Sequence, residues 1–76
     1  MSDTQIAMES FLLDLDIRAQ RDPRYQPLYR YLMTAPRVLP ALKSAISGSV
    51  SWGSIPVTVT ADMRGNLREM IRGAFT

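Results

Sequence analysis

The chain has 76 residues and contains no histidine and no cysteine. Hydrophobic residues make up 46% of it and charged residues 21%, which is typical of a folded globular domain and excludes a disordered tail or a fibrous repeat. The lack of cysteine excludes a disulfide-stapled scaffold, and a net charge of +2 is too small to indicate a nucleic-acid partner by itself.

The first predicted element is a helix over residues 4–20. Ser2 and Gln5 have the spacing of a capping box, and neither glycine nor proline interrupts the segment that follows them. Apolar residues then recur at helical spacing and define the face that we expect to pack on the core, namely Met8, Phe11, Leu12, Leu15 and Ala19.

The same helix carries a second apolar stripe. Ile6, Leu13 and Ile17 are spaced by seven and four residues, and they project roughly opposite the predicted core face. An exposed stripe of this kind would be adhesive. The helix is therefore either enclosed between other elements or leaves one side for a partner.

Two further helices are predicted, over residues 24–34 and 37–47. Pro27 either lies in the first turn of a helix that begins late or kinks the segment, and Pro40 marks the first turn of the next helix. Gly48 suits a left-handed residue that would end it. The positions expected to be apolar or buried are Tyr25, Leu28, Tyr29 and Leu32, followed by Val38, Leu39, Leu42, Ala45 and Ile46.

Residues 49–60 predict a β-hairpin. Apolar and polar residues alternate on both sides of Gly53 and Ser54, and glycine in the first loop position fits a type II′ turn. Pro56 lacks an N–H group and fits only where that group would point outward. The predicted pairs are Trp52 with Ile55 and Val50 with Val57.

A last helix is predicted over residues 62–74, capped by Thr60 or Asp62. Its apolar face would consist of Met63, Leu67, Met70, Ile71 and Ala74. The fold class is thus α+β and mostly helical, with three N-terminal helices, a two-stranded antiparallel β-hairpin and a C-terminal helix. Residues 1–76 form a single small domain, because no linker, repeat or low-complexity tract divides them.

Most catalytic arrangements need side chains that this chain lacks. Cysteine nucleophiles, histidine bases and the usual zinc sites are excluded. Asp14 and Asp16 are two residues apart on a helix and so face different ways, and no glycine-rich phosphate loop follows a strand. We therefore expect no enzyme activity, no catalytic or metal-binding residue and no cofactor.

Charge is unevenly distributed along the chain. Residues 1–17 carry four acidic residues and no base, which gives −4, whereas residues 18–76 carry nine bases and three acidic residues, which gives +6. This polarity either steers an acidic partner to the later part or lets the first helix lie against the basic remainder. We favour the second interpretation, since opposite charges within one small domain usually lie near each other.

Arg64, Arg68 and Arg72 form a stripe beside the apolar face of the last helix. Their stems would cover the edge of the core while the guanidinium groups stay in water. The stripe is either a solvated flank, which we favour, or a docking site for acidic side chains or phosphates.

A second basic segment interleaves arginine with tyrosine. The candidate nucleic-acid contacts are Arg24, Arg30, Tyr31 and Lys43, with Tyr31 exposed. Tyr25 and Tyr29 are interpreted as core residues, and Trp52 as a lid on the core rather than a binding anchor. The order of elements is shared with winged-helix DNA-binding domains. However, only Lys43 could contact DNA from the third helix, and the hairpin tip has no arginine or lysine.

The sequence thus predicts a small cytoplasmic protein that acts by binding. The first hypothesis is a non-enzymatic protein–protein interaction module, such as an adaptor, an assembly factor or an inhibitor of a larger protein, with a homodimer as one form of partnership. Its candidate partner-binding residues are Ile6, Leu13, Ile17, Arg64, Arg68 and Arg72. The alternative is a winged-helix-like nucleic-acid-binding regulator. No apolar run approaches the roughly 20 residues that cross a bilayer, so no membrane partner is expected.

Overall fold

The computed structural model describes residues 3–75 and contains four α-helices and one β-hairpin. In chain order the elements are α1 (Asp3–Arg21), the short 3-10 helix η1 (Pro23–Tyr25), α2 (Gln26–Thr34), α3 (Val38–Ser47), β1 (Val50–Trp52), β2 (Ile55–Val57) and α4 (Ala61–Phe75). This order confirms the predicted fold class of three helices, a two-stranded antiparallel hairpin and a final helix.

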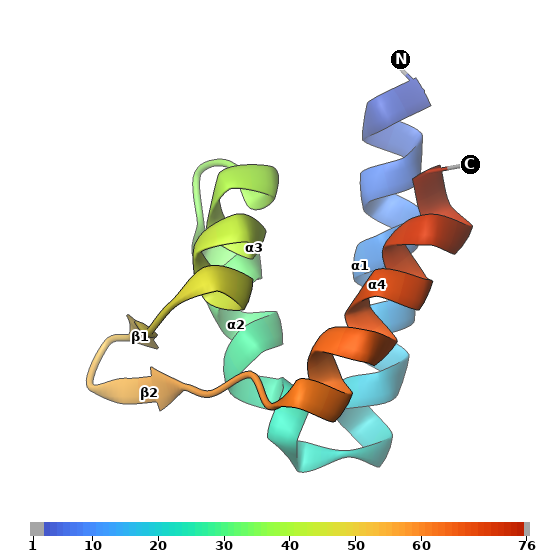
Figure 1. Cartoon of the computed structure of the whole chain (residues 1–76). Coiled ribbons are helices and arrows are strands. Elements are labelled where there is room, and N and C mark those ends of the chain that lie inside the picture. Colours follow the sequence, from blue (N-terminus) through green and yellow to red (C-terminus); the bar gives the residue numbers. More distant parts are fainter. Residues whose placement is uncertain (1–2, 76) are drawn as a thin grey trace.

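α2 lies at the centre of the fold and contacts α1, α3 and both strands. Figure 1 shows α1 and α4 side by side, with the start of α1 and the end of α4 at the same end of the molecule, and α3 and the hairpin on the other side of α2. The core fills the space between these two groups of elements. It consists of Phe11, Leu15, Ala19, Tyr25, Leu28, Leu32, Ala41, Leu42, Ala45, Val57, Met63, Leu67 and Met70.

Prolines and caps set the limits of the helices. Pro27 is the second residue of α2 and Pro40 the third of α3, where a missing N–H group breaks no intrahelical bond. Because α2 begins only at Gln26, Pro27 lies in its first turn and does not kink the helix. Asp22 caps η1 by accepting from the Arg24 N–H, and Thr60 Oγ1 accepts from the Met63 N–H at 3.4 Å at the start of α4.

One prediction about the helix ends is wrong, and another is not tested by the described residues. Gly48 was expected in the left-handed region, but its φ of −162° is extended, because the chain turns directly into β1 after the Gly48 N–H donates to the Ser44 carbonyl. The predicted capping box of α1 depends on Ser2, which lies outside the described residues.

The hairpin has the predicted register, with Val50 opposite Val57 and Trp52 opposite Ile55. Gly53 has a φ of 61°, and no described residue other than glycine has a positive φ, which fits a type II′ turn and excludes type I′. Val57 is buried, whereas Ile55, near the tip, is 43% exposed. The hairpin therefore covers the core through Val57 and Trp52, while Ile55 stays largely in solvent.

Candidate interaction surfaces

The first candidate surface is the side of α1 that points away from the core. Its residues Ile6, Leu13 and Ile17, here called the α1 outer face, are 52%, 63% and 46% exposed. On the opposite side of the same helix, Phe11 and Leu15 are fully buried. The helix with two apolar stripes is thus packed on one side only, and no other described element covers the second stripe.

Acidic side chains border the α1 outer face. Asp3, Glu9 and Asp14 are exposed, and among residues 3–75 none of them forms an ion pair. Asp16 is half-buried and accepts a hydrogen bond from Gln20 at 3.4 Å. The first helix does lie against the basic remainder, through α2 and α4, but no described ion pair joins its carboxylates to a base.

Both ends of the α1 outer face adjoin α4. Ile6 borders a hollow of about 430 Å³ that Gly73 and Phe75 line from α4. Ile17 borders a second hollow of about 250 Å³, lined from α4 by Asn66. The apolar stripe is therefore continuous with shallow depressions along the junction of the two helices.

The arginines of α4 occupy the flank that the helical spacing predicts. Met63, Leu67 and Met70 are buried, whereas Arg64 is half-buried and its two companions are exposed. Arg72 Nη1 lies 3.6 Å from Glu69 Oε1, and both side chains are 72% exposed, so this pair adds little stability. The geometry fits a solvated flank and leaves the docking role of Arg64, Arg68 and Arg72 a prediction.

Arg24 is held within the molecule. Its guanidinium group lies 2.8 Å from Asp22 Oδ2 and 3.1 Å from Asp62 Oδ2, which ties η1 to the start of α4. The Arg24 hydrogen bonds lower the pKa of Asp22, and the hydroxyl of Thr60, followed by Arg24, lowers the pKa of Asp62. Of the candidate nucleic-acid contacts, Arg24 is thus already engaged by two carboxylates.

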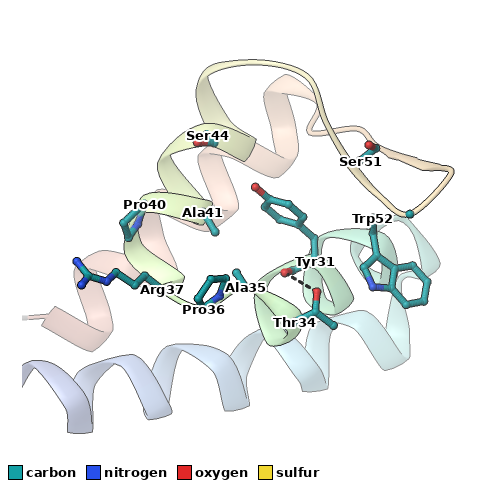
Figure 2. A pocket seen from close by; sticks show the side chains of 11 residues that line it. Tyr31, Thr34, Ala35, Pro36, Arg37, Pro40, Ala41, Ser44, Ser51 and Trp52 are labelled. Carbon is teal, nitrogen blue, oxygen red and sulfur yellow. Dashed lines mark hydrogen bonds between the residues drawn. The ribbon is translucent and has the colours of Figure 1, made fainter.

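A groove of about 600 Å³ runs between α3 and the hairpin. Figure 2 shows the Tyr31 ring pointing into this space, with Arg37 and Trp52 at opposite ends of the lining. The remaining lining residues are Thr34, Ala35, Pro36, Pro40, Ala41, Ser44, Ser51 and Gly53. We call this hollow the α3–hairpin groove.

Aromatic and cationic groups meet at this groove. Tyr31 was predicted to be exposed but is half-buried, because its ring points from α2 into the space between α3 and the hairpin. Trp52 is half-buried against the core, as the prediction of a lid requires, and the Arg30 guanidinium carbon lies 5.3 Å from its ring centroid. Lys43 is exposed on α3 but does not line the groove.

The sequence did not predict this groove, whose lining comes from α2, α3 and the hairpin. Arg37 and Trp52 were not among its candidate contacts, although one signal was present in the sequence. Residues 23–61 contain four bases and no acidic residue at all. Of these four bases, Arg24 pairs with Asp22 and Asp62, which flank the segment, and the other three form no ion pair among residues 3–75.

Among residues 3–75, no three side chains of the metal-binding types come together in a way that could hold an ion. None of the described helices is long and apolar enough to cross a membrane. Comparisons with protein-family models, with curated proteins and with solved structures found no match to this chain.

Proposed function

We propose that this chain is a small, non-enzymatic interaction module that docks onto another protein through the α1 outer face. The observation that carries the proposal is the exposure of Ile6, Leu13 and Ile17 on a helix whose other side lies in the core. Covering these side chains removes apolar area from water, at about 25 cal/mol per Å². An adaptor, an assembly factor and an inhibitor all require such a surface, and the lack of histidine and cysteine supports a role without catalysis.

The border of the α1 outer face indicates the chemistry of the partner. Asp3, Glu9 and Asp14 surround the stripe and have no ion pair within the described residues. A partner helix with an apolar face flanked by lysine or arginine would complement both features. A second copy of this chain fits less well, since packing α1 against α1 would bring these carboxylates together. A cytoplasmic location, favoured by the lack of cysteine, belongs to the same proposal.

The proposal is tested by affinity capture from cell extract with a double variant, Leu13→Lys with Ile17→Lys. Lysine keeps helix propensity, removes the apolar contacts and repels a basic partner. The matched control is Met33→Lys, because Met33 is 53% exposed but lies on α2. We expect quantitative mass spectrometry to show proteins that the parent chain and the control retain and the double variant loses, with unchanged helical circular dichroism.

Light scattering on the purified chain distinguishes the two kinds of partner. A mass of one chain, together with the selective loss of captured proteins, supports docking onto another protein. A dimer that the double variant converts to monomer would show that the α1 outer face binds its own copy. Identical captured sets for all three proteins would contradict the proposal.

A further inference from the structure

We propose that the α3–hairpin groove is a second binding site, which takes an extended acidic peptide segment as an additional strand on β1. This goes beyond docking through the α1 outer face and involves none of its residues. The groove combines a concave surface of about 600 Å³, aromatic side chains and an excess of positive charge. Its volume lies in the range of known ligand sites.

The charge of the region selects an anionic ligand. Between residues 23 and 61 the chain has four bases and no acid, and Arg24 is neutralised by Asp22 and Asp62. Arg30, Arg37 and Lys43 form no ion pair among the described residues. Arg37 lies at one end of the groove and Trp52 at the other, whereas Arg30 lies over the Trp52 ring but is not part of the lining. A carboxylate of a bound segment would therefore meet the guanidinium group of Arg37 inside the groove.

The backbone of β1 selects an extended peptide. In an antiparallel hairpin with a two-residue loop, the pair next to the loop exchanges its hydrogen bonds, and the following pair points its N–H and C=O groups outward. That following pair is Ser51 and Pro56. Ser51 lines the groove. Among residues 3–75, its main chain forms no main-chain hydrogen bond outside the hairpin. The outer edge of β1 is thus unpaired beside the groove, whereas Pro56 removes the donor from the edge of β2.

Side chains complete the fit for an alternating segment. Successive residues of a strand point to opposite sides, so every second residue of the peptide would face the groove. Tyr31 lies between Arg37 and Trp52, and Ala35 and Ala41 belong to the same lining. A segment with an acidic residue toward Arg37 and an apolar residue over Tyr31 matches this order of groups.

The same observations disfavour single-stranded nucleic acid. Bases need open aromatic faces on which to stack, and here the Arg30 guanidinium group already lies over the Trp52 ring. The unpaired N–H and C=O groups of Ser51 form a ladder only with another polypeptide. Nucleic-acid binding at the groove is accordingly an outcome that the experiment must exclude.

Trp52 is the chain's single tryptophan, so its fluorescence reports on the groove directly. The probes are a short peptide that alternates Glu with Val, its counterpart that alternates Lys with Val, and a short oligothymidylate. We expect only the acidic peptide to change the emission of Trp52 in a saturable way. Arg37→Glu should weaken its binding about tenfold or more, because it replaces an attraction with a repulsion.

The matched control is Arg68→Glu, which makes the same change of charge at an exposed arginine on α4. It should leave the affinity within about twofold, as should the Leu13→Lys and Ile17→Lys double variant, because exposed charges far apart are screened in salt. The result for the double variant tests this site independently of the α1 outer face. Either proposal can therefore be refuted without the other.

A second measurement tests the strand itself. In amide hydrogen exchange, addition of the acidic peptide should slow the exchange of the Ser51 N–H. The site is refuted by equal responses to the acidic and basic peptides, by no response at millimolar peptide, or by equal weakening in Arg37→Glu and Arg68→Glu. Tighter, Arg37-dependent binding of the oligothymidylate would assign the groove to nucleic acid, and unchanged exchange at Ser51 would remove the added strand.

Discussion

The segment from Asp3 to Asp16 and the segment spanning residues 23–61 differ in charge and in shape. The first carries four acidic residues and no base, on a helix that turns a convex apolar stripe to solvent. The second carries four bases and no acidic residue, and it folds into a concave groove with tyrosine and tryptophan in its lining. The two segments touch through α1 and α2, yet no described ion pair joins them.

Opposite charges in so small a domain would be expected to neutralise each other, and here they are separated. α1 contacts the rest of the fold through apolar side chains, and among the bases of the second segment the carboxylates of Asp22 and Asp62 pair only with Arg24. Each segment therefore keeps most of its charge for solvent or for a ligand. The two proposed surfaces are thus opposite in charge, one suited to a basic partner and the other to an acidic partner.

The largest expected effect separates the two sides of α1. Phe11→Ala should destabilise the fold by about 3–5 kcal/mol, because it removes a fully buried ring from the core. Leu13→Ala should change the free energy of unfolding by no more than about 0.5 kcal/mol, as is usual for exposed positions. Urea unfolding followed by circular dichroism measures both. A loss of stability from Leu13→Ala comparable to that from Phe11→Ala would mean that the outer face is packed and not free.

Glycine substitutions should act in opposite directions in the hairpin and in α4. Gly53→Ala should destabilise the hairpin by about 1–2 kcal/mol, because Gly53 has a φ of 61° that alanine adopts poorly. Gly65→Ala should stabilise α4 by up to about 1 kcal/mol, since an added Cβ would meet no atom within 4 Å and alanine favours helix. Thermal unfolding checks the signs. If both substitutions destabilise the chain, α4 packs differently around Gly65.

The weakest expected effect concerns the ion pairs of Arg24 with Asp22 and Asp62. Asp22 and Asp62 have pKa values below their ordinary value of 3.8, so they stabilise the fold above that pH. This contribution should disappear as the pH falls from about 4 through the lowered pKa values. Arg24→Gln should lower the melting temperature at neutral pH and flatten its decline below pH 4, as measured by circular dichroism. If the melting temperatures of both proteins decline in parallel, these ion pairs do not form in solution.

The sequence predicted the elements because local rules decide them. Helical spacing identified the core side of α1, and the alternation around Gly53 fixed the hairpin register. The exposed stripe of α1 was recognisable for the same reason, as a helix that is apolar on two sides. Its binding role, like that of the arginine stripe on α4, stays a prediction.

The groove could not be read in this way, because it forms only where α3 and the hairpin meet. Tyr31 was assigned to the surface since it lies outside the periodic stripe of α2, but α3 and the hairpin partly cover it. Gly48 was assigned a left-handed conformation from its position after a helix, yet the direct entry into β1 leaves it extended. These are tertiary effects that override local preference.

Site-specific photo-crosslinking from position 13 tests the central claim most directly. A photoreactive phenylalanine analogue replaces Leu13 in living cells, and a matched variant carries it at Met33, which is similarly exposed on α2. The account predicts one or a few discrete adducts with another protein from position 13 and none of them from position 33. No adduct from position 13, or adducts only with further copies of this chain, would contradict docking of the α1 outer face onto a different protein.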